Sequence, residues 1–395
     1  MQYRLDPVSG NKLSVLGFGC MRFPRGLNAK IDMDKTEKLI MSAIDSGVNY
    51  FDTAYAYKGS EEALGAVLNK NGLREKIFVA SKLPYNQCKR YEDFDRILQE
   101  QLSHLQTDYI DYYLIHNLPT TASWDRIRDL GVERFISETK KSGRIKQIGF
   151  SFHGAQNEFL SLLDPYDWDF CQIQYNYANE NYQAGRAGLL KAHEKGIPVI
   201  VMEPLLGGKL ANGLPKKAVK LFDGAGDGLS AASWALRWLW DQPQVTVVLS
   251  GMNSMEQLND NIKTAGNAAP GMLSEKEAAI FSEVVSVFEE SYKIPCTGCN
   301  YCMPCPHGVN IPGCFSAYNA SYAVGFMSGM MQYVTSTGMN HPIKNFSGRN
   351  CEKCGACEKK CPQHIGIIKS LEAVSGRMEP FWVRAILKLY LTFSK

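Results

Sequence analysis

The chain lacks several features that would assign it to a secreted, membrane or nucleic-acid-binding class. Its first residues, MQYRLDPVSGNKLSVLGFG, have neither the basic start nor the apolar core of a signal peptide, and no stretch reaches the roughly 18 uninterrupted apolar residues that span a bilayer. The formal net charge of +3 over 395 residues gives no broad basic surface for nucleic acid. We therefore expect a soluble cytoplasmic protein with no transmembrane segment and no nucleic-acid partner.

Cysteine is scarce in most of the chain and abundant near its end. Three of the twelve cysteines lie in the first 290 residues, whereas nine lie between Cys296 and Cys361. This division predicts a second domain with its own chemistry, and in a cytosolic chain closely spaced cysteines are metal ligands more often than disulfides. We expect one domain over residues 1–288 and a smaller one over residues 289–395.

The first domain alternates short apolar runs with helical periodicity, which is typical of parallel βα units. Eight candidate strands begin at Leu13, Val48, Ile77, Tyr109, Ile145, Phe170, Pro198 and Val245. Eight units favour an α/β fold of the (β/α)8 TIM-barrel type, and a dinucleotide-binding doubly wound sheet is disfavoured because no GxGxxG follows the first strand. The first helix is expected to start at Asp34, with Glu37 as its capping-box partner, and to stop at Gly47.

Candidate catalytic residues close successive strands of this barrel, where barrel enzymes place their active sites. Asp52, Lys82 and His116 end the second, third and fourth strands, and Tyr57 lies in the loop after the second. Reducing a carbonyl needs a proton donor at its oxygen, and a tyrosine hydroxyl can donate when a nearby ammonium stabilises the phenolate. Lys82 could supply that charge, Asp52 could hold Lys82, and His116 could orient the carbonyl. Each residue alone has a structural explanation, but together they favour catalysis.

Residues 1–285 resemble the aldo-keto reductase superfamily. The matching segments are GFGCMR, NYFDTAYAYKGSEEALG, IFVASKLP, DYIDYYLIH, IKQIGFS, CQIQYN, VMEPLLGG and MEQLNDN. The family's catalytic tetrad corresponds here to Asp52, Tyr57, Lys82 and His116. The resemblance therefore implies that a small-molecule carbonyl is reduced, or an alcohol oxidised, with NADP(H) or NAD(H).

The same resemblance implies where the nicotinamide end of the cofactor binds. Ser151 and Gln172 match positions that hold the carboxamide in the family. Cys20 and Met21 would lie beside the nicotinamide ribose. Met202 stands where relatives often place an aromatic residue that stacks on the nicotinamide.

For the adenine end, the resemblance implies contacts from Asp260 and Asn261. The run SGMNS from Ser250 lacks the Lys or Arg that usually pairs with a 2′-phosphate in the family. NADPH is the family's usual cofactor, but we expect weak discrimination between NADPH and NADH here.

The cysteine-rich segment contains two closely spaced runs, CxxCxxCxxCP from Cys296 and CxxCxxCxxxCP from Cys351. In two-cluster ferredoxins three thiolates of a run hold one cubane, and the fourth, before the proline, ligates the other cluster. We therefore expect one [4Fe-4S] cluster on Cys296, Cys299, Cys302 and Cys361. The second cluster is expected on Cys351, Cys354, Cys357 and Cys305.

Two alternatives remain open for this segment. CxxC pairs also suit tetrahedral zinc, although zinc sites usually space their pairs farther apart. Cys314 could replace Cys305 as a ligand, because the first run is one residue short. The whole segment resembles a bacterial ferredoxin-type domain, helix- and loop-rich, and we expect it to end in a C-terminal helix whose apolar face carries Trp382, Ile386, Leu389 and Phe393.

Three hypotheses for function follow. In the leading one, the barrel is an iron-sulfur oxidoreductase of the aldo-keto reductase type, and the clusters exchange electrons with a protein partner such as a ferredoxin. In the second, the clusters are structural and the barrel is an ordinary reductase. In the third, the protein is an electron-transfer or redox-sensing module with a repurposed barrel, and the complete tetrad counts against this. A flavin could mediate between one-electron clusters and a hydride carrier, but no sequence feature requires one.

Overall fold

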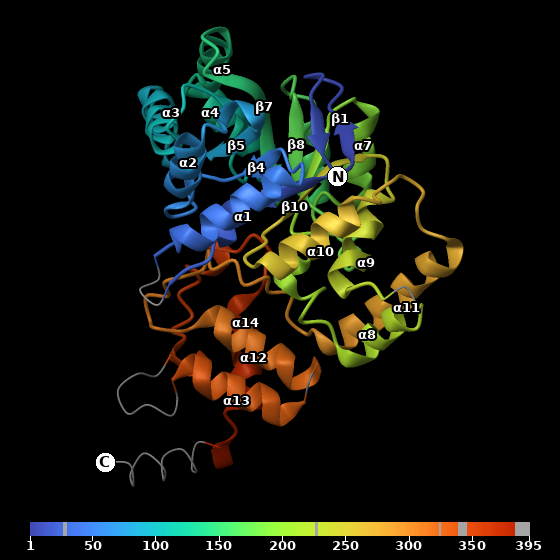
Figure 1. The fold of residues 1–395 in the computed structure, drawn as a ribbon. Coiled ribbons are helices and arrows are strands. Elements are labelled where there is room, and N and C mark those ends of the chain that lie inside the picture. Colours follow the sequence, from blue (N-terminus) through green and yellow to red (C-terminus); the bar gives the residue numbers. More distant parts are fainter. Residues whose placement is uncertain (27–29, 226–227, 324, 339–345, 384–395) are drawn as a thin grey trace. The chain divides into compact units, whose positions relative to one another are not determined.

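The computed structural model describes the chain except for residues 27–29, 226–227, 324, 339–345 and 384–395 (Figure 1). Most of the predicted C-terminal helix, including Ile386, Leu389 and Phe393, therefore lies outside the described residues. In the part of the chain that is described, no helix has the length and apolar character needed to cross a membrane.

The chain forms two compact units. The first, the barrel unit, comprises Met1–Leu205 and Ala232–Ser274, and the second, the cysteine unit, comprises Leu206–Ala231 and Glu275–Lys395. The single boundary expected after residue 288 stays a prediction. The division also differs from a single boundary in one respect. Residues 206–231, which lie between two barrel strands in the sequence, belong to the cysteine unit.

The barrel unit is a closed barrel of eight parallel strands (Figure 1), which confirms the predicted fold. The strands are β3 (Leu16–Gly19), β4 (Tyr50–Asp52), β5 (Phe78–Leu83), β6 (Ile110–Ile115), β7 (Ile145–Phe152), β8 (Phe170–Gln174), β9 (Val199–Met202) and β10 (Val245–Ser250). Strand β10 pairs with β3 and so closes the cylinder. The carboxyl ends of all eight strands therefore meet at one end of the barrel.

The first predicted strand is divided in the structure. Lys12–Ser14 forms β2, which pairs with β1 (Tyr3–Leu5) in an antiparallel hairpin, and the barrel strand starts only at Leu16. The backbone N–H of Ser14 donates to Asn49 Oδ1 at 2.8 Å. Ser14 Oγ in turn accepts from Asn49 N at 3.0 Å, so Asn49 holds the residue that lies between the hairpin and the barrel strand.

The hairpin closes the amino-terminal end of the barrel. Tyr112, from inside β6, donates its hydroxyl to Asp6 Oδ2 at 2.8 Å and accepts from Asn11 Nδ2 at 3.1 Å. Arg4 donates from Nη1 to the carbonyl oxygen of Gln242 at 2.7 Å and also bonds the Val245 carbonyl at the start of β10. The first residues of the chain thus bond the last strand of the barrel.

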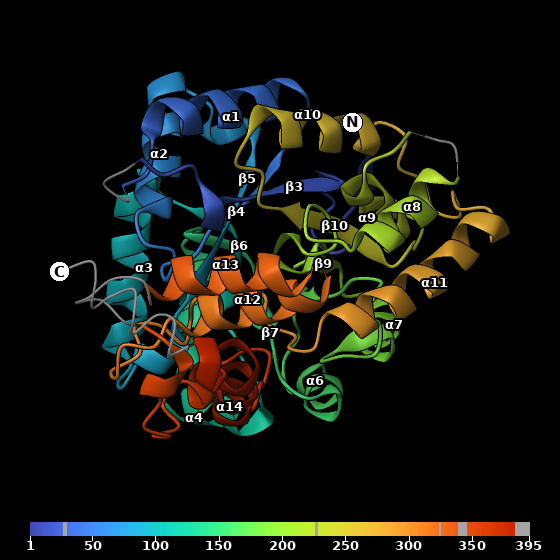
Figure 2. The ribbon, with the colours of Figure 1, turned by 90° about the horizontal axis from the view of Figure 1, so that it is seen from below.

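Helices surround the strands, and Figures 1 and 2 show α1 and α2 next to one another on the barrel surface. The helices of this unit are α1 (Met33–Asp45), α2 (Ser60–Asn71), α3 (Glu92–Leu105), α4 (Thr121–Asp129), α5 (Val132–Lys141), α6 (Gln156–Leu162), α7 (Gly185–Glu194), α9 (Ala231–Trp240) and α10 (Met255–Ala265). The cap predicted at Asp34 is wrong. Asp32 is the N-cap, because its carboxylate accepts from Lys35 N at 3.1 Å, and Glu37 instead pairs with Lys70.

The cysteine unit is built from helices and loops. Its helices are α8 (Lys216–Asp223), α11 (Glu275–Ser291), α12 (Ile311–Ala323), α13 (Phe326–Thr337) and α14 (Ile367–Met378). Helices α12 and α13 run side by side (Figures 1 and 2). Phe315, Tyr333 and Leu371 belong to its apolar core, against which six of the cysteines of the two runs pack: Cys296, Cys302, Cys305, Cys351, Cys357 and Cys361.

Candidate active site and cluster-binding sites

A buried ion pair lies at the carboxyl end of two neighbouring barrel strands. Lys82 is 1% exposed and Asp52 is 4% exposed. Lys82 Nζ donates to both carboxylate oxygens of Asp52 and to the carbonyl oxygen of Thr53, the last at 2.7 Å. Each charge compensates the other where water cannot, so the two side chains must stay together.

The other two predicted catalytic residues lie against this pair. Lys82 Nζ is 5.1 Å from the centroid of the Tyr57 ring. The rings of Tyr57 and His116 meet edge to face, with centroids 6.0 Å apart and an interplanar angle of 88°. The structure therefore brings Asp52, Tyr57, Lys82 and His116 into one cluster.

His116 is electrically neutral at ordinary pH. Its burial, followed by the positive charge of Lys82 and a smaller effect of His153, lowers the pKa of His116 to about 3. A neutral imidazole carries one N–H donor and one acceptor nitrogen. His116 can therefore donate a hydrogen bond to a carbonyl oxygen, and it is unsuited to give that oxygen a full proton.

The residues expected to hold the carboxamide sit on adjacent strands, with Ser151 paired to Gln172 in register. Gln172 Nε2 donates to Asp52 Oδ1 at 3.2 Å, and Ser151 Oγ accepts from Asn117 N at 2.8 Å. Among the described residues, Asn117 Oδ1 is buried and meets no hydrogen-bond donor. A carboxamide offers N–H groups for Asn117 Oδ1 and an oxygen for the Ser151 hydroxyl, so these residues fit that group.

Three further predicted cofactor residues lie at strand ends of the same unit. Cys20 follows β3 and is fully buried. Its burial, and then the charge of Asp52, raise the pKa of the Cys20 thiol, so it stays protonated. Met21 follows it and is half-buried, as is Met202, the last residue of β9. All three positions are compatible with cofactor contact, which remains a prediction.

The two predicted adenine contacts have partners within the protein. Asn261, 3% exposed, donates from Nδ2 to Ser250 Oγ at 2.9 Å. Asp260 Oδ2 accepts from Ser233 Oγ at 3.3 Å. Asn261 thus fixes the end of β10, whether or not it also contacts a cofactor.

Arg22 is a candidate that the sequence interpretation missed. It lies beside Gly251 in the run that follows β10, since a Cβ added to Gly251 would be 3.5 Å from Arg22 Cδ. The signal was available, because Arg22 ends the GFGCMR segment after the first barrel strand. In a closed barrel the first and last strands are neighbours, so their loops meet.

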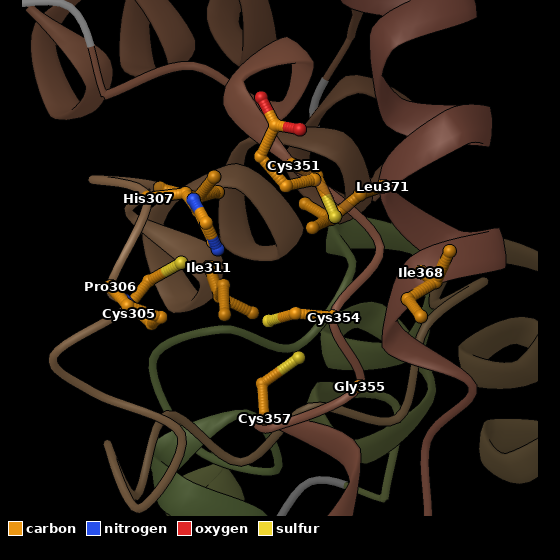
Figure 3. A pocket seen from close by; sticks show the side chains of 12 residues that line it. Cys305, Pro306, His307, Ile311, Cys351, Cys354, Gly355, Cys357, Ile368 and Leu371 are labelled. Atoms are coloured by element: carbon orange, nitrogen blue, oxygen red, sulfur yellow. The ribbon is translucent and has the colours of Figure 1, made fainter.

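The cysteines surround two cavities in the cysteine unit. In Figure 3 sulfur atoms from both runs point into one cavity, which is lined by Cys305, Cys351, Cys354 and Cys357. The other cavity is lined by Cys296, Cys299, Cys302 and Cys361. Each cavity takes three cysteines from one run and one from the other. Four thiols spread around a cavity suit a cubane better than a single zinc ion, whose thiolates lie about 2.3 Å away.

Cys314 occupies a different place. It is fully buried in the apolar core of the unit, where the Tyr333 hydroxyl is a hydrogen-bonding neighbour. Burial raises the pKa of the Cys314 thiol to about 12. Among the described residues that line the two cavities, Cys305 is present and Cys314 is not. The geometry therefore favours Cys305 as the fourth ligand.

The barrel unit carries a Tyr–Lys–Asp–His cluster at its strand ends, and the cysteine unit carries two cavities lined by four cysteines each. Together these features indicate an oxidoreductase with an iron-sulfur domain. The family model described as "Aldo/keto reductase family" matches residues 15–284, and the model of a 4Fe-4S dicluster domain matches residues 295–366. The chain belongs to the aldo/keto reductase family and is an oxidoreductase that carries a 4Fe-4S ferredoxin-type domain.

Relatives support this membership. The chain is 27% identical to Protein tas of Escherichia coli strain K12 over 327 residues, covering 67% of this chain and 93% of the relative. It is 23% identical to the L-glyceraldehyde 3-phosphate reductase of the same strain, covering 68% and 88%. Among solved structures, the holo form of aldo-keto reductase AKR11C1 from Bacillus halodurans matches with a TM-score of 0.59 and 25% identity, covering 72% of this chain and 96% of that one.

The lowered pKa of His116 generates a prediction about stability. Above about pH 6.5 His116 is neutral in both the folded and unfolded states, but as the pH falls from about 6.5 toward about 3 only the unfolded state gains the proton. His116 therefore makes the folded protein lose stability over that interval. We expect the free energy of unfolding to fall less steeply below about pH 6.5 in His116→Asn than in wild type. Urea denaturation at several pH values, followed by circular dichroism, measures this. Equal slopes in the two proteins would show that His116 titrates normally in the folded state.

Proposed function

We propose that the barrel unit reduces a carbonyl to an alcohol, or catalyses the reverse reaction, with NADPH or NADH. The observation that carries this proposal is the Lys82 ammonium, held by Asp52 at 5.1 Å from the centre of the Tyr57 ring. A positive charge beside a phenol stabilises its phenolate, so the Tyr57 hydroxyl can release its proton to a substrate oxygen. One relative is named as a reductase of a small phosphorylated aldehyde, which supports a small carbonyl substrate.

Each residue then has a separate task. Neutral His116 donates a hydrogen bond to the substrate oxygen and aligns it with the Tyr57 hydroxyl. When bound, NAD(P)H supplies the hydride that the carbonyl carbon accepts. Ser151 and Asn117 would hold the carboxamide, which fixes which face of the ring meets the substrate.

Tyr57→Phe tests the proton donor. We expect this variant to lower the turnover of an aromatic aldehyde such as 4-nitrobenzaldehyde by about 10² to 10⁴, with cofactor binding nearly unchanged, because it removes proton transfer and little else. Tyr55→Phe is the matched control, since Tyr55 lies in the same loop but its hydroxyl donates to Glu100 at 2.7 Å. A Tyr57→Phe enzyme with half the wild-type turnover would exclude Tyr57 as the acid.

We also propose that Arg22 is the cation near the 2′-phosphate of NADPH. The run from Ser250 contains no basic residue of its own, and Arg22 lies beside its Gly251. Because Arg22 is exposed and water and salt screen its charge, we expect wild-type protein to prefer NADPH over NADH by no more than about tenfold, or about 1.4 kcal/mol. We expect Arg22→Ala to abolish that preference. Fluorescence titration of both proteins with both cofactors measures it. An unchanged ratio would mean that another residue recognises the phosphate, or that none does.

For the cysteine unit, we propose two [4Fe-4S] clusters with crossed ligands that exchange electrons with a protein partner such as a ferredoxin. The match to a dicluster domain and the two four-cysteine cavities support the clusters. A purely structural role is the second candidate, and one observation favours it: cysteines of both runs pack against the apolar core, so clusters there would also crosslink that core.

The crossed ligation predicts a specific pattern of iron loss. Cys361→Ser and Cys299→Ser should each lose about half of the iron, and the double variant should lose no more, because both residues serve one cluster. Cys361→Ser combined with Cys357→Ser should lose nearly all of it, although these two residues lie in the same run. Iron and sulfide analysis under anaerobic conditions measures the pattern, with Cys314→Ala as the control that keeps both clusters.

The same Cys361→Ser protein separates the two candidate roles of the clusters. If the clusters carry electrons, the folded variant should keep NAD(P)H-driven aldehyde reduction and lose any reaction driven by reduced ferredoxin. If they are structural, wild-type protein should show no electron exchange with ferredoxin at all, and the variant should differ only in its stability. Circular dichroism confirms that the variant compared is folded.

A further inference from the structure

The turn that follows strand β9 contacts the peptide of the first cluster cysteine. This turn, Leu206–Lys209, belongs to the cysteine unit although β9 belongs to the barrel unit. Lys209 Nζ donates to the backbone carbonyl oxygen of Cys296. Gly207 has a φ of +70°, and a Cβ there would overlap the carbonyl oxygen of Thr297. Two successive peptides of the first cysteine run therefore rest against this turn.

The turn is held in place by the rest of its segment. The half-buried Lys209 ammonium lies 5.1 Å from the centre of the Tyr292 ring, and the Tyr292 hydroxyl donates to the Gly213 carbonyl. Phe222 of α8 meets Phe281 of α11 at 5.6 Å between ring centroids. Because α11 leads directly into the first cysteine run, the ammonium has a fixed position relative to Cys296.

The charges near the two cavities differ. The first cavity is the one lined by Cys296, Cys299, Cys302 and Cys361. None of the described residues that line it is acidic or basic, and the Lys209 ammonium bonds the backbone carbonyl of Cys296. The second cavity is lined by Glu352 and His307, and Lys353, which is exposed and paired with Glu372, lies near Cys351. The Lys353 charge is screened by solvent, whereas Lys209 is half-buried. A [4Fe-4S] cluster gains a negative charge on reduction, so a nearby cation raises its reduction potential and a nearby carboxylate lowers it.

We propose that Lys209 raises the reduction potential of the cluster held by Cys296, Cys299, Cys302 and Cys361 above that of the second cluster, and that the Gly207 turn holds this cluster's loop in place. The inference rests on the clusters of the proposed function. It assigns Lys209 as a tuning residue, which touches a ligand's backbone rather than substrate. Electrons that enter at the second cluster then collect on the first, whose loop is contacted by the chain segment that continues β9.

Lys209→Met tests the electrostatic part. An anaerobic redox titration followed by electron paramagnetic resonance should resolve two potentials in wild-type protein. In the variant, the equilibrium constant for reducing the higher-potential cluster should fall about tenfold, which lowers its potential by about 59 mV for a one-electron couple. The lower one should stay in place. Lys209→Arg keeps the charge and should keep the potential.

Lys360→Met is the matched control for this experiment. Lys360 directly precedes Cys361, a ligand of the same cluster, but it is exposed to solvent. Water and salt screen an exposed charge, so its removal should shift the potential much less than removal of Lys209.

Gly207→Ala and Gly208→Ala test whether the Gly207 turn holds the cysteine loop in place. Both glycines have positive φ values, +70° and +95°, so an alanine strains the backbone at either position. Only Gly207 faces the Thr297 carbonyl, while a Cβ at Gly208 would meet nothing within 4 Å. We expect Gly207→Ala to lose much of one cluster, shown by iron content, and Gly208→Ala to retain both.

The outcomes are distinct. Protein purified anaerobically without clusters would overturn the proposed function of the cysteine unit, and with it this inference. Protein with both clusters whose two potentials are the same in wild type and in Lys209→Met would overturn only the role of Lys209. If Lys209→Met loses the cluster, Lys209→Gln decides, because it keeps a donor without the charge. A wild-type potential in that variant, or loss of the cluster there too, would leave Lys209 a structural residue and refute the electrostatic proposal. Equal iron loss in Gly207→Ala and Gly208→Ala would refute the seating role.

Discussion

The contact between Lys82 and Asp52 constrains three strands of the barrel at once. Two charges removed from water are each costly by several kcal/mol unless they meet each other and additional hydrogen-bonding groups. Here Asp52 receives Lys82 Nζ and Gln172 Nε2, and Lys82 also donates to the Thr53 carbonyl. These groups come from β4, β5 and β8, so three strands must keep their register for the pair to survive. The same pair places a positive charge beside Tyr57, and the Lys82 charge adds to the larger effect of burial in lowering the pKa of His116.

A second buried network supports the strand that carries Lys82. Gln101 of α3 donates from Nε2 to the Lys82 carbonyl oxygen at 3.2 Å, and to Ser81 Oγ at 2.8 Å and Glu61 Oε1 at 2.7 Å. Tyr113 of the neighbouring strand donates to Gln101 Oε1 at 2.6 Å. Burial raises the pKa of Glu61, and the hydrogen bonds that it accepts counter this. The ammonium is thus positioned through its own backbone as well as through its carboxylate partner.

The sequence was sufficient for the parts of the fold that repeat. Eight apolar runs indicated eight strands, because a strand covered by helices and closed into a barrel is apolar on both faces. The cluster of Asp52, Lys82 and His116 followed from the rule that parallel strands end at the same rim. The crossed arrangement of the cysteines around two cavities also agrees with the expectation from their spacing.

The sequence could not decide between two residues equally suited to one local role, and it could not show contacts between residues distant in the chain. The N-cap at Asp32 was missed because both Asp32 and Asp34 can cap a helix, and only the bond to Lys35 N distinguishes them. The position of Arg22 beside Gly251 depends on ring closure between the first and last strands. Likewise, no periodicity could show that the segment after β9 belongs with the cysteines, since that contact joins residues far apart in the chain.

The hydrogen bonds from Arg4 of the N-terminal hairpin to the start of β10 can form only late in synthesis. Arg4 is made before the carbonyl groups of Gln242 and Val245 that it bonds, and more than two hundred residues separate them in the chain. The barrel therefore cannot close its seam as it emerges, and a long nascent chain exposes unpaired strand edges until the eighth strand arrives. Until β10 is made, the edges of β3 and β9 that it pairs with stay open, and open strand edges are the feature of partly folded chains that favours aggregation.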